Sequence, residues 1–138
     1  MATADRDAPG AGRPTILVID DDARVLASFK GLFEMLLPIE VATAESGAAG
    51  LDLLQRRSVR LVIVDFRMPG MNGLEFIQRA RELAPELPYY LFTAYASEEL
   101  KRLSAGGRPQ RYVSKNEMPE HIAAFIAEDL GLDGSGRS

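Results

Sequence analysis

A chain of 138 residues suits one compact domain with a sizeable core and leaves little room for a second. Its hydrophobic fraction of 46% and charged fraction of 26% are ordinary for a soluble globular protein, and no apolar stretch approaches the ~20 residues of a membrane span. The net charge of −4, with scattered lysines and arginines, argues against direct nucleic-acid binding.

The two ends of the chain differ in composition from its middle. The first residues lack the basic flank and apolar segment of a secretory signal, and cysteine is absent, so a cytoplasmic location is the simplest expectation. Residues 1–13 and 132–138 show no hydrophobic periodicity, and we expect them to be flexible tails. The folded domain is expected at 14–131.

The first strand and helix are separated by consecutive acids. The apolar, β-rich run 15–19 predicts a strand that stops at Asp20, Asp21 and Asp22. Apolar residues then recur at helical spacing over 25–36. We expect Asp22 to cap that helix, and the whole acidic run could be no more than a cap with solvated acids.

A second strand and helix follow Pro38, which interrupts the helical pattern. Residues 39–42 can form the strand, and 46–57 carry apolar residues at helical spacing. Ser46 or Glu45 could start this second helix.

The third strand ends in an acid. The run 60–65 is β-branched and apolar up to Asp65, and a glycine-containing loop and a helix over 74–83 follow. Because a carboxylate needs water, a cation or hydrogen-bond donors, we expect Asp65 to leave the sheet exposed. It is the candidate reactive residue, although an acid at a strand end can also merely cap the next helix.

The last part of the chain repeats the alternation twice. The predicted elements are a strand at 87–92, a weaker helix at 98–105, a strand at 112–114 and a closing helix at 120–130. The two strands lead to Thr93 and Lys115.

Five alternations of strand and helix predict an α/β fold with a parallel sheet covered on both faces. In such sheets ligands bind beyond the carboxyl ends of the strands. Polar residues distant in sequence can therefore meet at one edge: Asp20, Asp21, Asp65, Thr93 and Lys115.

These five residues suggest phosphoryl chemistry. When three carboxylates are crowded together, the pKa of at least one of them rises or a cation is required. Oxygen ligands favour magnesium, Mg²⁺, over zinc. Lys115 can supply a positive charge and Thr93 a hydroxyl to phosphoryl oxygens, while Asp65 can attack phosphorus and form an aspartyl phosphate. Taken singly, Thr93 could be an ordinary strand-end residue and Lys115 a surface charge.

Four segments together resemble the receiver domain of two-component response regulators, across nearly the whole folded region. They are Ile16-Leu-Val-Ile-Asp-Asp-Asp22, Val62-Ile-Val-Asp-Phe-Arg-Met-Pro-Gly-Met-Asn-Gly73, Phe92-Thr-Ala94 and Tyr112-Val-Ser-Lys115. The resemblance implies a flavodoxin-like (βα)5 fold, that is, a doubly wound, five-stranded parallel sheet in a three-layer sandwich.

The resemblance also implies roles for individual residues. Asp65 would be the phosphoacceptor; Asp20, Asp21, Asp65 and the backbone carbonyl of Arg67 would bind Mg²⁺. Thr93 and Lys115 would contact the phosphoryl group. Ala94 matches the small residue beside the hydroxyl that leaves access for the phosphodonor, and Tyr112 aligns with an aromatic switch residue that turns inward as Thr93 moves; otherwise it is a half-buried strand tyrosine.

The implied function is phosphorelay signal transduction. The domain would accept a phosphoryl group from a sensor histidine kinase or a histidine phosphotransfer protein, assisting its own phosphorylation and dephosphorylation without being an enzyme in the usual sense. The modification would shift a surface formed by the fourth helix, fifth strand and fifth helix towards a downstream protein target. A homodimer is possible, and neither a membrane nor nucleic acid is an expected partner.

Several positions depart from the family pattern or vary within it. Asn116 stands where the family usually has proline after the lysine, so we expect a trans peptide bond or a remodelled loop. Arg67 and Tyr95 flank the site, where they either govern water access or vary without consequence. His121 in the closing helix is expected to be structural rather than a phosphodonor.

Two other functions remain open on the sequence. A Mg²⁺-dependent hydrolase of small phosphates could use the same acids, but it needs a further acid or base for which no clear candidate exists. A pseudo-receiver acting as a constitutive interaction module would leave the acids unused, and the complete set of five polar site residues argues against it.

Overall fold

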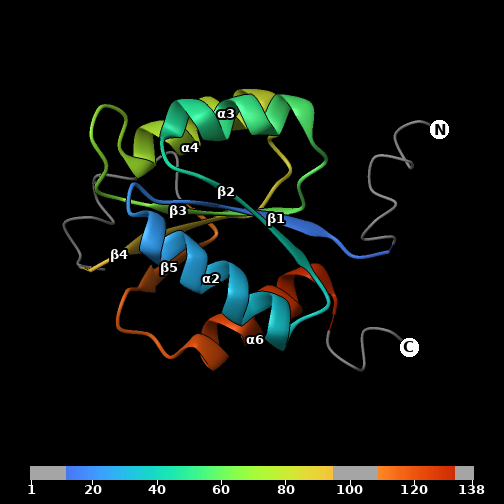
Figure 1. Cartoon of the computed structure of the whole chain (residues 1–138). Helices are drawn as coiled ribbons and strands as arrows, with labels where there is room; N and C mark the ends of the chain where they lie inside the picture. Colours follow the sequence, from blue (N-terminus) through green and yellow to red (C-terminus); the bar gives the residue numbers. More distant parts are fainter. Residues whose placement is uncertain (1–11, 95–108, 133–138) are drawn as a thin grey trace.

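The computed structural model describes residues 12–94 and 109–132, which form a sheet with helices on both faces (Figure 1). The strands are β1 (Thr15–Ile19), β2 (Glu40–Ala44), β3 (Leu61–Asp65), β4 (Tyr89–Thr93) and β5 (Arg111–Ser114). The helices are α2 (Ala23–Leu36), α3 (Gly47–Arg56), α4 (Gly73–Leu83) and α6 (Pro119–Leu130). The helix predicted at 98–105, Tyr95 and most of the two predicted tails lie outside the described residues.

The five strands are all parallel and lie in the order β2-β1-β3-β4-β5. This order confirms the expected flavodoxin-like, doubly wound α/β fold. The strand order reverses at β1, which lies between β2 and β3. Doubly wound sheets bind ligands in the crevice beyond the carboxyl ends of the strands at this point, so the topology directs attention to the residues that follow β1 and β3.

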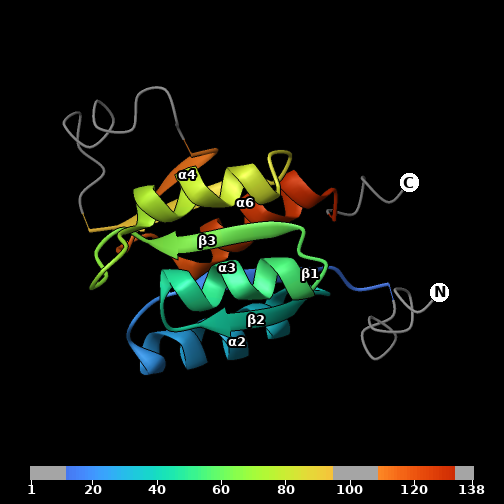
Figure 2. The ribbon, with the colours of Figure 1, turned by 90° about the horizontal axis from the view of Figure 1, so that it is seen from above.

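The helices form one layer on each face of the sheet. α3 and α4 cover one face, and α2 and α6 cover the other (Figures 1 and 2). In β1, Ile16 and Val18 pack on the α2 side while Leu17 and Ile19 pack on the α3 side. Because both faces are buried, the strand is apolar throughout rather than alternating. No helix in the described ranges is both long and apolar enough to cross a membrane.

Side-chain caps fix where three helices begin. Asp22 accepts a hydrogen bond from the Arg24 N–H at 2.9 Å, as expected, and Ser46 rather than Glu45 starts α3 by accepting from the Ala49 N–H at 3.1 Å. α4 begins with a reciprocal capping box between Asn72 and Glu75. These caps satisfy amide groups that have no partner inside the helix.

The bounds of β2, β4 and β5 differ from those predicted by one or two residues, for reasons that the pairing shows. β2 extends to Ala44 because it remains paired with β1 up to Ile19. β4 begins at Tyr89, two residues later than predicted, because Pro88 has no N–H to donate, although its carbonyl accepts from the Val62 N–H. β5 begins one residue earlier, at Arg111, which pairs with Tyr90.

Candidate functional site

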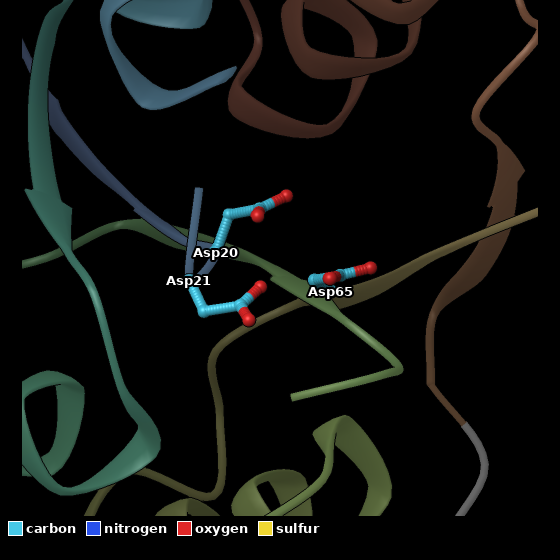
Figure 3. A group of neighbouring side chains, drawn as sticks. All are labelled: Asp20, Asp21 and Asp65. Atoms are coloured by element: carbon cyan, nitrogen blue, oxygen red, sulfur yellow. The ribbon is translucent and has the colours of Figure 1, made fainter. Parts of the chain in front are cut away.

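Three acids converge where β1 and β3 end (Figure 3). Asp20 and Asp21 directly follow β1, and Asp65 is the last residue of β3. One carboxylate oxygen from each of them lies within 4.8 Å of the other two. Because β1 and β3 are neighbouring parallel strands, their carboxyl ends lie side by side. The structure therefore brings together the three acids that the sequence singled out.

The expectation that Asp65 is exposed was wrong. The residue is only 3% exposed, and the Lys115 Nζ lies 2.8 Å from its Oδ1. Burial removes water from a carboxylate, and an ammonium group within hydrogen-bonding distance compensates for that loss. Asp65 is thus a sheltered carboxylate with one oxygen held by a cation.

The carboxyl group of Asp20 is buried and only partly hydrogen-bonded. Its Oδ1 accepts from the Asp22 N–H at 2.9 Å, while its Oδ2 is buried without any hydrogen-bond partner. Burial raises the pKa of Asp20, and the neighbouring charge of Asp65 raises it further. The reading of the acidic run as solvated acids therefore fails for Asp20, which is 3% exposed, whereas Asp21 is exposed and Asp22 is the helix cap.

A hard cation fits this donor set. The carboxylates supply only oxygen ligands, which Mg²⁺ prefers, and the Asp20 Oδ2 needs a positively charged partner. Crowding three negative charges is costly without a counterion, and Lys115 neutralises only one of them. The arrangement suits a divalent cation better than three solvated acids.

The remaining predicted residues line a small cavity over Asp65. This cavity has a volume of about 340 Å³, and its walls are Asp65, Arg67, Thr93, Ala94 and Lys115. Thr93 is the last residue of β4 and is 2% exposed, whereas Arg67 lies in the loop after β3 with an exposed side chain. The cavity thus combines a carboxylate, a hydroxyl and an ammonium group on three neighbouring strand ends.

Lys115 reaches the cavity from the end of β5. Its backbone N–H donates to the Thr93 carbonyl at 2.9 Å, which extends the pairing of β4 with β5 by one residue. Its ammonium group lies 5.7 Å from the centre of the Phe92 ring as well as against Asp65. The described residues contain no cis peptide bond, so the bond from Lys115 to Asn116 is trans, as expected.

Tyr112 and His121, which the sequence singled out, belong neither to the acidic group nor to the lining of the cavity over Asp65. Tyr112 in β5 is half-buried and packs against the core on the α3 and α4 side. His121 lies in α6, where its Nδ1 is 2.6 Å from the Glu117 carboxylate. His121 is therefore not part of the acidic group.

Gly73 is a feature of the site that the sequence did not single out. It is the first residue of α4, and its backbone does not adopt a positive φ, unlike that of Gly70 in the preceding loop. Its role is close approach: a Cβ at this position would lie 2.6 Å from the Asp65 carbonyl oxygen and 2.7 Å from the Leu91 Cδ1. The sequence contains no signal for this contact, because the residues that Gly73 meets belong to other elements.

The chain is similar to proteins of known class. A family model described as the response regulator receiver domain matches residues 16–127. The chain is 31% identical over 126 residues to a chemotaxis protein CheY homolog of Campylobacter jejuni, covering 88% of this chain and 95% of that protein. It is 29% identical over 123 residues to the hydrogenase transcriptional regulatory protein HoxA of Cupriavidus necator, covering 87% of this chain but spanning only 25% of that regulator's length.

Solved structures show the same similarity in three dimensions. A CheY-like response regulator receiver domain protein from Methanospirillum hungatei superposes with a TM-score of 0.80 at 29% sequence identity. The match covers 86% of this chain and 94% of that one.

Proposed function

The chain belongs to the response regulator receiver domain family, and from this premise we propose that it accepts a phosphoryl group on Asp65. The observation that carries the proposal is the buried Asp65 carboxylate, held at 2.8 Å by Lys115 beside two further acids. The immediate donor would be a phosphohistidine on a sensor histidine kinase or on a histidine phosphotransfer protein. The chain is then a signalling phosphoacceptor rather than an enzyme with a diffusing substrate.

The transfer would use groups that line the cavity over Asp65. A carboxylate oxygen of Asp65 attacks phosphorus, and the bond from phosphorus to the donor's imidazole nitrogen breaks. The electron pair of the broken bond leaves with the imidazole, so no general base is needed. Lys115 and Thr93 line the cavity over Asp65, and their ammonium and hydroxyl groups would bind the phosphoryl oxygens and stabilise the charge on them.

Asp20, Asp21, Asp65 and the backbone carbonyl of Arg67 would hold Mg²⁺, which supplies positive charge to the phosphoryl oxygens during transfer. The unpartnered Oδ2 of Asp20 supports this assignment, since a buried carboxylate oxygen without a donor calls for a cation. The Lys115 ammonium group pairs with Asp65 before the phosphodonor arrives, and it would then pair with the oxygens of the new phosphoryl group.

The phosphodonor protein would approach over α2 and the start of α6. A groove of about 470 Å³ lies there, and Lys115 forms part of its wall together with Phe29, Phe92, Glu117 and Ile122. Apolar and charged side chains both line the groove, which suits a protein partner, and because Lys115 also contacts Asp65, a histidine docked there would lie close to Asp65. The expected compartment is the cytoplasm, where a kinase has access to ATP.

The output would be a population shift set by Thr93 and Tyr112. A phosphoryl group on Asp65 attracts the Thr93 hydroxyl, and the space that Thr93 leaves lets Tyr112 turn inward. The surface around β5 and α6 then changes for a downstream protein target or for a second copy of the chain.

Phosphoryl acceptance is tested by incubating the protein with Mg²⁺ and acetyl phosphate and mapping the adduct by mass spectrometry. We expect one base-labile phosphoryl group on Asp65, no adduct when EDTA replaces Mg²⁺, and none in Asp65→Asn. His121→Asn is the matched control and keeps full labelling. Persistent labelling of Asp65→Asn contradicts the assignment, rapid multiple turnover indicates a small-phosphate hydrolase, and absence of any adduct indicates a pseudo-receiver.

The switch is tested with beryllofluoride, which mimics an aspartyl phosphate. We expect Mg²⁺ and beryllofluoride to shift the NMR signals of both Thr93 and Tyr112 in the native chain. In Thr93→Ala the Tyr112 signals stay at their unmodified positions, since the hydroxyl that couples the site to β5 is missing. Light scattering on the same samples reports whether the modified form dimerises.

A further inference from the structure

Ser114 accepts two hydrogen bonds that close the turn containing Lys115. Ser114 is the last residue of β5, and its Oγ accepts a hydrogen bond from the Asn116 N–H at 3.0 Å. Its carbonyl oxygen also accepts from the Glu117 N–H at 3.0 Å. Lys115 is therefore the second residue of a four-residue turn whose first residue provides both acceptors.

This turn depends on a backbone donor at position 116. Asn116 has an N–H, and the peptide bond before it is trans. A proline at the third position of such a turn has no N–H and restricts the conformation of the residue before it. The pair Ser114 and Asn116 thus constrains the backbone of Lys115 by a hydrogen bond.

The constraint matters because the lysine side chain is flexible. Its four-carbon stem must hold the Nζ 2.8 Å from the Asp65 Oδ1 across the gap between β5 and β3. The backbone is fixed on one side of Lys115 by its own N–H on the Thr93 carbonyl at 2.9 Å. The Ser114 hydroxyl fixes it on the other side.

We propose that Ser114 is the positioning residue for Lys115: its hydroxyl holds the turn in which the ammonium group reaches Asp65. This inference rests on the proposed function insofar as Lys115 assists phosphoryl transfer. The ion pair itself, however, can be measured without any phosphorylation.

The deciding experiment measures the coupling between Lys115 and Asp65 by urea unfolding of the full chain in EDTA. Native protein, Lys115→Met, Asp65→Asn and the double variant form one thermodynamic cycle, which is repeated with Ser114→Ala and with Ser114→Thr. The coupling factor is the interaction between the two side chains expressed as a ratio of unfolding equilibrium constants. We expect Ser114→Ala to lower it by about threefold or more, the size of one lost hydrogen bond, and Ser114→Thr to restore it. Asn116→Ala keeps the N–H and leaves the coupling unchanged.

The second readout is the rate of labelling by acetyl phosphate. Ser114→Ala slows labelling about three- to tenfold when Lys115 is present and has no effect in the Lys115→Met background, because Ser114 acts through Lys115. A coupling factor that Ser114→Ala leaves unchanged overturns the inference, whatever the labelling shows. If the native chain takes no label, the proposed function fails, while the unfolding cycle still decides the role of Ser114.

Discussion

Asp20 and Asp65 are equally buried acids with different surroundings. Asp65 has an ammonium partner at 2.8 Å, whereas one oxygen of Asp20 has no partner at all. The pKa of Asp20 is raised chiefly by burial, so its charged form is unfavourable until a cation compensates for the lost water. The proposed Mg²⁺ would balance the charge of these two acids together with that of Asp21.

The first prediction concerns Mg²⁺ and Asp20. Mg²⁺ raises the melting temperature of the native chain, because a ligand that binds only the folded state stabilises it. Asp20→Asn removes most of this increase but is itself more stable than the native chain in EDTA, by about 1 kcal/mol, since it deletes an uncompensated buried charge. Thermal unfolding with and without Mg²⁺ measures both effects, and an equal Mg²⁺ response in both proteins contradicts the prediction.

Gly73 leaves no room for a side chain beside the end of β3. Gly73→Ala places a methyl group 2.6 Å from the Asp65 carbonyl oxygen, so the end of β3 or the start of α4 must shift. We expect a loss of about 1–3 kcal/mol in unfolding free energy, together with slower labelling of Asp65.

Gly31→Ala is the control for this substitution. Gly31 lies on the exposed side of α2, and a Cβ there meets nothing within 4 Å. We expect Gly31→Ala to raise the unfolding free energy by about 0.5–1 kcal/mol, because alanine has a better helix propensity than glycine. If Gly73→Ala changes neither the unfolding free energy nor the labelling rate, the start of α4 accommodates the methyl group without disturbing Asp65, and the prediction is wrong.

Among the elements, β2 lies at an edge of the sheet but does not leave all of its backbone groups open. The Val41 N–H donates to the Glu34 carboxylate, and the Lys30 ammonium group donates to the Val41 carbonyl, both at 2.8 Å. Lys30 and Glu34 also pair with each other at 2.8 Å. Two side chains of α2 thereby take the place of a neighbouring strand, which protects the edge from pairing with another chain.

The prediction for this element is that Glu34→Ala weakens the edge. The Val41 amide loses its acceptor, so we expect faster hydrogen exchange at Val41 and a loss of about 1–2 kcal/mol in unfolding free energy. Glu34→Gln retains an oxygen acceptor and keeps more of the protection. The exchange rate of the Val41 amide, measured by NMR in both variants and in the native chain, tests this prediction. Unchanged exchange at Val41 in Glu34→Ala means that water replaces the carboxylate without cost.

In the molecule as a whole, two adjacent tyrosines of β4 connect the sheet to the helix layers on its two faces. Tyr89 points to the α3 and α4 side and donates to the Ala84 carbonyl at 2.8 Å. Tyr90 points to the α2 and α6 side, where its hydroxyl donates to Asp129, which also pairs with Arg111. Both rings are fully buried, so each phenol must stay neutral or find a partner for its charge.

These tyrosines predict a loss of stability at alkaline pH. Burial raises the pKa of Tyr89 to about 12 from 10.0, and burial together with the Asp129 hydrogen bond raises the pKa of Tyr90. The folded state therefore keeps its phenol protons while the unfolded chain loses them. The stabilisation is complete below pH 10.0 and is lost as the pH rises towards about 12.

Urea unfolding between pH 9 and pH 12 tests this expectation. Each tyrosine adds a slope of about 1.4 kcal/mol per pH unit while only the unfolded state ionises. Tyr89→Phe removes one such slope and flattens the profile. A profile as steep as that of the native chain assigns the alkaline loss to groups other than Tyr89.

The amino-acid sequence was enough to predict the five strands, four of the helices, the cap at Asp22 and the polar residues that follow the strands, while it left Ser46 and Glu45 as alternative starts of α3. These features are local: hydrophobic periodicity and capping depend on residues within a few positions of each other. Because parallel strands end at one edge, the sequence also predicted which acids would meet. The family motifs pointed to the same residues.

The surroundings of those residues depend on packing between distant segments, so they became known from the structure alone. The burial of Asp65, the unpartnered oxygen of Asp20 and the contact of Gly73 with β3 all depend on groups from other elements. The same holds for the ion pair of Lys115 with Asp65 and for the hydrogen bonds between α2 side chains and the backbone of Val41. Periodicity reports which face of an element is apolar, but burial and hydrogen-bond partners are set by packing between segments distant in the chain, which no local pattern encodes.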